Sequence, residues 1–263
     1  MTREISGLSE IEDAFSAVIV DQYGVLHDGQ MPFPGALEAL TRLHANNIPI
    51  VALTNSGKRA KTNADRLQRI GFPGGLFTAV VSSGDIARDQ LKKLPSGSSI
   101  LLIAREGETE LLDGLDLIHA KHGEKADMIV FAAVEPARRS RTDYAEDLLP
   151  YARNKTPALL VNPDHLAAEN GTIVFGPGAV AEDYARSGGP VETLGKPARK
   201  MFDVALAALG NPSSDRVLMI GDSPHHDIGG AIEAGLQTLL IRDGIQSDLE
   251  GINADFSMHR LSW

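Results

Sequence analysis

One stretch of the sequence decides the fold: Ala17-Val18-Ile19-Val20-Asp21-Gln22-Tyr23-Gly24-Val25-Leu26. Its first four residues are apolar and mostly β-branched, which is typical of a buried strand. The strand ends at Asp21, and Gly24 permits a tight turn just beyond it. Ligands bind at the carboxyl ends of the strands in open parallel sheets. The stretch therefore predicts that Asp21 lies in a ligand-binding crevice.

Two further apolar runs end in polar residues in the same way. Residues 49–53 are followed by Thr54-Asn55-Ser56, and residues 216–220 are followed by Gly221-Asp222-Ser223. If these strands are parallel neighbours of the first, all three polar ends meet at one end of the sheet. Each polar residue taken alone could equally cap the N-terminus of a following helix. The occurrence of the pattern in three places favours a shared site.

The rest of the chain alternates between helix and strand patterns, which predicts an α/β fold. This alternation restarts near residue 85, and Ser187-Gly188-Gly189-Pro190 closes the second series. We therefore predict a core domain of residues 1–84 plus 189–263 and an inserted domain of residues 85–188. The predicted helices are 58–70, 86–94, 143–154, 198–209 and 227–234, and the further predicted strands are 78–81, 99–103, 128–132, 158–161, 191–194 and 237–241.

Composition restricts the classes of partner. The 263-residue chain has 25 Lys and Arg against 35 Asp and Glu, a net charge of -10, which argues against nucleic acid and anionic membranes. It has no cysteine, so disulfides, thiolate zinc sites and a cysteine nucleophile are excluded. The polar N-terminus lacks the apolar core of a signal peptide, and no apolar run is long enough to span a bilayer. We expect a cytoplasmic protein that acts on a small molecule, and a homodimer is compatible with the sequence.

Four motifs, in this order along the chain, resemble those of the haloacid dehalogenase-like hydrolases. They are Asp21-Gln22-Tyr23-Gly24-Val25-Leu26, Leu53-Thr54-Asn55, Gly195-Lys196-Pro197 and Gly221-Asp222-Ser223-Pro224-His225-His226-Asp227. The inserted segment, with Asn162-Pro163-Asp164, looks like the large α/β cap of the class IIA branch, which includes nitrophenylphosphatases and nucleotide and sugar phosphatases. The resemblance implies a Rossmann-like parallel-sheet core with an inserted α/β cap domain, and a phosphatase that hydrolyses a small phosphate ester.

The resemblance also implies roles for the motif residues. Asp21 would be the nucleophile that forms an aspartyl phosphate, which suits a carboxylate at a strand end. Mg²⁺ would be bound by Asp21, the carbonyl of Tyr23 and Asp222, and Asp227 would orient the waters of the ion. Lys196 would offset negative charge on Asp21 and on the phosphoryl oxygens.

The resemblance also assigns residues to phosphate binding and to substrate binding. The resemblance assigns the phosphoryl oxygens to the residues after the second strand and to the motif lysine: Thr54, Asn55, Ser56 and Lys196. It assigns contacts with the rest of the substrate to two cap residues, Asn162 and Asp164.

The local sequence leaves other interpretations of these residues open. Lys196 precedes Pro197 at a predicted helix start, where a solvated surface lysine is common. Asp227 would also stabilise a helix N-terminus through the helix dipole. The segment Asn162-Pro163-Asp164 is typical of an Asx turn. The pair His225-His226 suggests metal ligands, but adjacent helical side chains point about 100° apart and do not share an ion readily, so exposed loop histidines are the simpler interpretation.

Position 23 departs from the phosphatase pattern, because Tyr23 stands where these phosphatases usually carry a second aspartate that serves as acid and base. Tyrosine has a reference pKa of about 10, so it can donate a proton but is a poor base near neutral pH. A tyrosine here also resembles the haloacid dehalogenases themselves. Two alternatives therefore stay open: a metal-independent dehalogenase-like hydrolase, and a non-catalytic protein that binds a phospho-ligand. The acidic fourth motif, with Asp222 and Asp227, favours the magnesium-dependent phosphatase.

Asp28 is a candidate for the missing acid. It follows Asp21 by seven positions and is the nearest carboxylate in sequence within the connection after the first strand. The pair Asp28-Gly29 is also typical of a solvated turn, which is the simpler interpretation.

Overall fold

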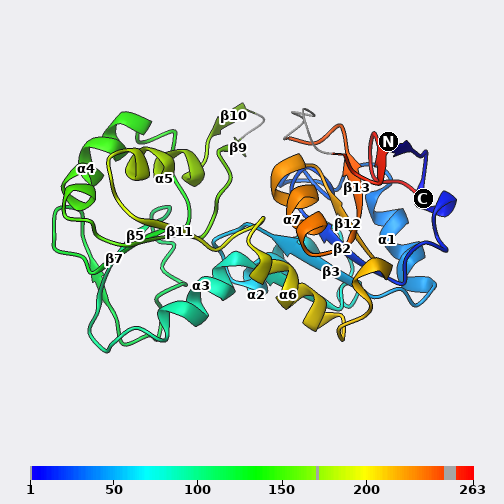
Figure 1. The fold of residues 1–263 in the computed structure, drawn as a ribbon, viewed down its shortest axis with the longest axis horizontal. Helices are drawn as coiled ribbons and strands as arrows, with labels where there is room; N and C mark the ends of the chain where they lie inside the picture. Colours follow the sequence, from blue (N-terminus) through cyan, green and yellow to red (C-terminus); the bar gives the residue numbers. More distant parts are fainter. Residues whose placement is uncertain (1, 170–171, 246–252) are drawn as a thin grey trace. The chain divides into compact units, whose positions relative to one another are not determined.

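The computed structural model describes residues 2–169, 172–245 and 253–263 (Figure 1). The chain divides into two compact units. The core unit comprises Met1–Thr54, Lys61–Val81 and Lys196–Trp263, and the inserted unit comprises Asn55–Ala60 and Ser82–Gly195. Nothing in the sequence indicates that Asn55–Ala60 packs with the inserted unit. An independent domain over residues 85–188 stays a prediction.

Within the described residues, the core unit contains a seven-stranded sheet with the order β1-β14-β13-β12-β2-β3-β4. Every pair from β1 to β3 along this order is parallel, which confirms the predicted α/β fold with a parallel-sheet core. The strands β12 (Val217–Gly221), β2 (Ala17–Asp21) and β3 (Ile50–Thr54) are neighbours, so the three apolar runs end together. The other strands are β1 (Arg3–Glu4), β4 (Ala79–Ser82), β13 (Gln237–Ile241) and β14 (Phe256–Met258).

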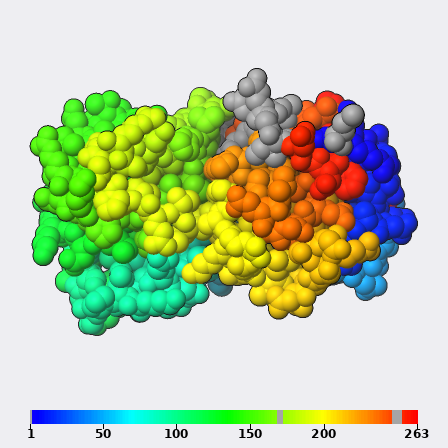
Figure 2. Space-filling model, viewed as in Figure 1, coloured from blue at the N-terminus to red at the C-terminus, as the bar shows by residue number. Residues whose placement is uncertain are grey.

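The helices of the core unit are α1 (Ala36–Ala45), α2 (Ala60–Arg69), α6 (Arg199–Ala208) and α7 (Gly230–Glu233). Two of them, α2 and α6, follow the predicted ranges 58–70 and 198–209, whereas the helix near the fourth motif does not follow its predicted range. A π-helical turn over Pro224–Gly229 precedes α7, so the helical path begins before the predicted start at residue 227. Ser223 begins this turn, because its side chain accepts a hydrogen bond from the N–H of His226 at 3.2 Å. Figure 2 shows α6, in yellow, and α7, in orange, on one face of the core unit.

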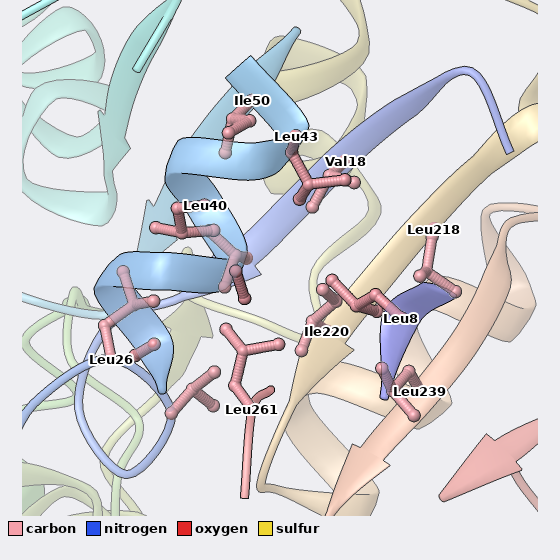
Figure 3. Packing of buried hydrophobic residues seen from close by; sticks show 14 of the residues in the cluster. Leu8, Val18, Leu26, Leu40, Leu43, Ile50, Leu218, Ile220, Leu239 and Leu261 are labelled. Atoms are coloured by element: carbon pink, nitrogen blue, oxygen red, sulfur yellow. The ribbon is translucent and has the colours of Figure 1, made fainter. Parts of the chain in front are cut away.

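Leucine, isoleucine and valine side chains pack between α1 and the sheet of the core unit (Figure 3). Leu40 and Leu43 of α1 are fully buried and lie on one face of the helix, because they are three residues apart. The strands contribute Val18, Ile50 and Ile220 to the same cluster. Burying each such side chain stabilises the fold by about 1.5–3 kcal/mol. This packing holds the ends of β2, β3 and β12 in fixed relative positions.

The inserted unit has its own sheet, five-stranded in the part of the chain that the structure describes, with the order β11-β8-β7-β5-β6 and parallel pairs. An antiparallel hairpin of β9 (Leu166–Glu169) and β10 (Thr172–Phe175) is separate from this sheet. The ring of Tyr184 packs against that of Phe131, with centroids 5.7 Å apart. The remaining elements are β5 (Ser99–Ile103), β6 (Ile118–Ala120), β7 (Met128–Phe131), β8 (Ala158–Leu160), β11 (Val191–Thr193), α3 (Ser83–Leu91), α4 (Arg141–Arg153) and α5 (Pro177–Arg186).

The sequence patterns do not predict three short strands, β1, β6 and β14, or the hairpin. β1 has two residues, and β6 and β14 have three each, so they are too short to show a period-2 pattern. In the ranges that the structure covers, none of the helices has the length and apolar character needed to cross a membrane.

Candidate active site

Lys196 forms two ion pairs inside the core unit. Its Nζ lies 2.5 Å from Oδ1 of Asp21, at the end of β2, and 2.6 Å from Oδ1 of Asp227. The lysine is 2% exposed and Asp21 is 8% exposed. The interpretation of Lys196 as a solvated surface residue is therefore wrong. Its side chain is buried because two carboxylates at the sheet end compensate its charge.

The pKa shifts of Asp21 and Lys196 indicate that the site carries an excess of negative charge. Burial raises the pKa of Asp21 and Lys196 lowers it, but Asp227 and Asp222 raise it again, and the net pKa lies well above the usual value. For Lys196, burial favours a lower pKa, but Asp21 and Asp227 raise it above the usual value. The lysine is thus charged throughout the physiological range, and the carboxylates would gain from a further cation.

Asp21, Asp222 and Asp227 form a buried cluster whose carboxylate oxygens lie within 4.8 Å of one another. Mg²⁺ prefers such hard oxygen ligands. The three carboxylates carry three negative charges, of which Lys196 offsets one. A divalent cation fits this donor set in both charge and chemistry. The predicted acidic ligands are therefore brought together.

Asp227 is held by the turn that follows β12. Its Oδ2 accepts a hydrogen bond from the N–H of Ser223 at 3.0 Å, while Oδ1 accepts from Lys196. A Cβ atom on Gly221 would lie 2.2 Å from Cβ of Asp227, so only glycine fits at the end of the strand. Asp227 is thus oriented by backbone and lysine together. It does more than stabilise a helix N-terminus.

Tyr23 lies between a histidine and an arginine that the sequence patterns did not single out. Its half-buried ring meets the His27 ring edge to face, with centroids 4.6 Å apart. The Cζ of Arg66, on α2, lies 5.5 Å from the centroid of the Tyr23 ring. A Cβ atom on Gly29 would lie 2.6 Å from the Tyr23 hydroxyl oxygen. These contacts fix the tyrosine ring two residues after the candidate nucleophile.

His27 is fully buried and acts as a hydrogen-bond acceptor. Its Nδ1 accepts from the N–H of Gly29 at 3.0 Å. Burial and the nearby guanidinium of Arg66 lower the pKa of His27 to about 4, against an opposite effect of Asp28. The imidazole is therefore neutral near pH 7. No sequence signal distinguishes His27 or Arg66 from ordinary polar residues.

Asp28 serves the turn after β2. Its Oδ1 accepts from the N–H groups of Gln30 and Met31, both at 2.8 Å, and the side chain is exposed. The hydrogen bonds from the backbone of Met31 and Gln30 lower the pKa of Asp28. This geometry matches the simpler interpretation, a solvated turn residue. A carboxyl group with a lowered pKa is a poor proton donor.

Three of the residues predicted to bind phosphate, Thr54, Asn55 and Ser56, lie at the end of β3 and just after it. Thr54 and Asn55 are buried. Within the inserted unit, Asn55 Nδ2 donates to Oδ1 of Asp164 at 2.9 Å, and the carbonyl of Ser56 accepts from Ser83 Oγ at 3.0 Å. Two residues predicted for different tasks, phosphate binding and substrate contact, are therefore joined by a hydrogen bond.

Asn162 and Asp164 form the Asx turn that their sequence suggests. Oδ1 of Asn162 accepts from the N–H of Asp164 at 3.0 Å, a geometry that fixes the direction of the Asp164 side chain. A Cβ atom on Gly195 would lie 2.4 Å from Pro163 and 2.8 Å from Oδ1 of Asn55. The turn thus packs closely against the residue that precedes the motif lysine.

The expectation that both adjacent histidines are exposed is wrong for one of them. His225 is exposed, whereas His226 is buried. Its backbone N–H donates to Ser223 Oγ, so the π-helical turn directs the two rings differently. Their centroids are 5.3 Å apart.

Comparisons with known proteins agree on one family. A model described as haloacid dehalogenase-like hydrolase matches residues 18–118, and one described as HAD-hydrolase-like matches residues 193–261. The human haloacid dehalogenase-like hydrolase domain-containing protein 2 is 28% identical over 249 residues, which cover 91% of this chain and 90% of that protein. An acid sugar phosphatase of Staphylococcus epidermidis is 25% identical over 236 residues, covering 89% and 88%.

A solved structure gives the same result. The crystal structure of a haloacid dehalogenase-like family hydrolase from Brucella suis aligns with a TM-score of 0.91 and 28% identity, covering 98% of this chain and 99% of that chain. The parallel-sheet core and the matched sequences define a hydrolase with a Rossmann-like α/β fold. Within that class, the chain belongs to the haloacid dehalogenase-like hydrolases. The resemblance of its four motifs is confirmed.

Proposed function

We propose that the protein is a Mg²⁺-dependent phosphatase that hydrolyses a small phosphorylated metabolite through an aspartyl phosphate. The buried cluster of Asp21, Asp222 and Asp227, with Lys196 in its midst, is the observation that carries the proposal. The similarity to an acid sugar phosphatase of Staphylococcus epidermidis supports it.

Asp21 is the nucleophile in this proposal. Its carboxylate oxygen forms a bond to phosphorus while the bond from phosphorus to the alcohol oxygen breaks, and water then hydrolyses the acyl phosphate. Lys196 lowers the pKa of Asp21, which favours the ionised nucleophile, and offsets charge on the phosphoryl oxygens. Mg²⁺, bound by Asp21, Asp222 and the carbonyl of Tyr23 with Asp227 orienting its waters, would neutralise phosphoryl charge.

The remaining predicted residues keep their proposed roles. Thr54, Asn55 and Ser56 bind the phosphoryl oxygens, and Asn162 and Asp164 contact the rest of the substrate. Their support is the hydrogen bond from Asn55 to Asp164. The Tyr23 hydroxyl donates the proton that the departing alkoxide needs, although a phenol is less suited than a carboxylic acid to accept one from water afterwards.

Two alternatives remain as outcomes of the test. A metal-independent dehalogenase-like hydrolase would share Asp21, Tyr23 and Lys196, but it has no use for the carboxylates of Asp222 and Asp227 beside the nucleophile. A non-catalytic protein would bind a phospho-ligand with Mg²⁺ and release no phosphate. Tyr23 can still donate a proton to the leaving group although it is a poor base, which favours slow turnover over none.

The test is phosphate release from 4-nitrophenyl phosphate, sugar phosphates and nucleotides, with and without Mg²⁺. We expect Mg²⁺-dependent release that Asp21→Asn abolishes, because an amide cannot attack phosphorus effectively. Asp203→Asn, at an exposed position of α6, is the matched control and should behave as the parent. Parent-like turnover by Asp21→Asn would exclude the aspartyl phosphate. Release of halide from a 2-haloacid without metal would establish the dehalogenase alternative.

A further inference from the structure

Arg66 is a half-buried cation without a carboxylate partner. It lies on α2, and among the described residues it forms no ion pair. Its guanidinium instead lies over the ring of Tyr23, with Cζ 5.5 Å from the ring centroid. Such a contact stabilises a cation only modestly, by about 0.5–2 kcal/mol. The guanidinium therefore keeps its capacity to bind an anion.

Two neighbours of Arg66 are shown by the structure: the Tyr23 ring and the neutral imidazole of His27. The Tyr23 hydroxyl makes no hydrogen bond to any residue in the described ranges, and the ring is fixed by His27 and Gly29. His27 Nδ1 accepts a hydrogen bond from the N–H of Gly29, so the proton of the neutral ring lies on Nε2. The cluster thus presents a guanidinium and a phenol, and no carboxylate of the described residues pairs with either of them.

The chain also limits how far this cluster lies from the nucleophile. Tyr23 follows Asp21 by two residues, so their Cα atoms are at most about 7 Å apart. A planar guanidinium binds a carboxylate or a phosphate with two parallel hydrogen bonds.

We propose that Arg66 and Tyr23 form a subsite for a second anionic group, a carboxylate or a phosphate, on the alcohol part of the substrate. The proposal rests on the proposed phosphatase function and narrows its substrates to short dianionic compounds. In this arrangement the guanidinium binds the anion and the Tyr23 ring positions the guanidinium, which leaves the Tyr23 hydroxyl to protonate the departing alkoxide. His27 holds the tyrosine ring in place.

The experiment compares three compounds of equal chain length: propyl phosphate, 3-phosphonooxypropanoate and propane-1,3-diyl bisphosphate. We expect the kcat/KM of the parent to be about tenfold or more higher for 3-phosphonooxypropanoate, for the bisphosphate or for both than for propyl phosphate. A charge-assisted hydrogen bond usually contributes an effect of this size. Arg66→Gln should reduce that preference at least tenfold, mainly through KM. Arg66→Lys, which keeps the charge but loses the planar donor geometry, should restore it only in part.

The matched control is Arg69→Gln. Arg69 is an exposed arginine on the same helix, and its Nε donates to the carbonyl of Asp65. It should retain the preference of the parent. If Arg66→Gln lowers kcat/KM equally for all three compounds, the residue serves only the packing of Tyr23 and the subsite is excluded. A preference for the carboxylate alone, or the bisphosphate alone, identifies the second group.

A binding measurement separates this proposal from the proposed function. Titration calorimetry of Asp21→Asn with the same three compounds reports affinity without turnover. If the parent hydrolyses none of the compounds, the phosphatase proposal fails for them. In that case, a loss of dianion affinity of about tenfold when Arg66→Gln is added still supports the subsite. Equal affinities with and without Arg66→Gln overturn it.

Discussion

A Cβ atom on Gly24 would lie only 2.1 Å from Oδ2 of Asp222. The backbone just after the candidate nucleophile therefore touches the carboxylate at the end of β12. Gly24 has a φ of +84°, which also favours glycine. A Cβ atom on Gly244 would lie 2.2 Å from Cβ of Asp222, and the N–H of Ile245 donates to its Oδ2 at 2.6 Å. The carboxylate is held by backbone on two sides, which is the rigidity that a small, octahedral cation requires.

Removing that carboxylate should weaken Mg²⁺ binding. Loss of an outer-shell partner typically costs about 10–100-fold in metal affinity, and loss of a direct ligand costs at least as much. We expect Asp222→Ala to lower Mg²⁺ affinity by about 100-fold or more, measured by titration calorimetry. The exposed Asp203→Ala should bind as the parent does. Unchanged affinity of Asp222→Ala would place the ion elsewhere.

Replacing Lys196 should destabilise the metal-free protein. Lys196→Met leaves Asp21 and Asp227 buried without their ammonium partner, and breaking a buried ion pair on one side costs about 3–5 kcal/mol. Chemical denaturation without Mg²⁺ should show this loss. Added Mg²⁺ should recover part of it by binding the folded state. Lys200→Met, at an exposed position of α6, is the control. A stability equal to the parent's would mean that the two contacts contribute nothing.

Restoring an aspartate at position 23 should raise phosphatase turnover. Tyr23→Asp supplies a positioned acid and base, which contributes up to about 10²-fold here on the usual scale of such groups. Steady-state kcat with propyl phosphate, which has no second anionic group for the Arg66 subsite, is the measurement. A variant that is no faster than the parent would show that proton transfer at position 23 does not limit the rate.

Asp28→Asn should leave turnover nearly unchanged. The amide keeps an oxygen that can accept the hydrogen bonds from Gln30 and Met31, so the turn persists. The parent carboxylate is exposed, and its pKa is lowered by those bonds. A clear fall in kcat at constant Mg²⁺ affinity would instead assign the missing acid to Asp28.

Acidification should destabilise the fold through His27. The pKa of His27 is about 4 when folded, against a reference of about 6.5 when unfolded. The unfolded state therefore binds more protons between these values, so stability is present above pH 6.5 and is lost as the pH falls toward 4. By pH 5 the loss from this residue is about 2 kcal/mol.

The measurement is the free energy of unfolding at pH 7.5 and pH 5. His27→Gln should start from a lower stability at pH 7.5 but lose about 2 kcal/mol less on acidification than the parent does. His44→Gln, an exposed histidine on α1, should retain the pH dependence of the parent. An identical dependence in parent and His27→Gln would show that the imidazole is protonated without cost.

The strand ends could be predicted from sequence, and the partners of their side chains could not. Residues 17–21 and 217–221 are apolar runs that stop at a polar residue or just before one, so hydrophobic pattern and parallel pairing suffice to bring Asp21 and Asp222 together. Lys196 shows no such pattern. Its local sequence fits a surface residue, and only the family motif predicted its place among the carboxylates.

Arg66 and His27 are harder cases. Arg66 is one of several basic residues on a polar helix, and its contact with Tyr23 depends on where tertiary packing places α2. His27 is buried because the turn after β2 folds back on itself, with the N–H of Phe33 donating to the carbonyl of Leu26. Neither arrangement produces a periodic pattern of apolar residues in the sequence. Both follow from tertiary packing.

The grouping of Asn55–Ala60 with the inserted unit has a consequence for protein engineering. Joining Val81 to Lys196 would excise residues 82–195, but it would also remove Asp164, the partner of Asn55, and Asp85, the partner of Arg59. The loop that is proposed to bind the phosphoryl group therefore depends on contacts with residues 82–195, which this deletion removes. The shortened enzyme would keep its three clustered carboxylates but lose the residues that support the loop. A design of a smaller version of this hydrolase therefore has to keep the inserted unit or redesign residues 55–60.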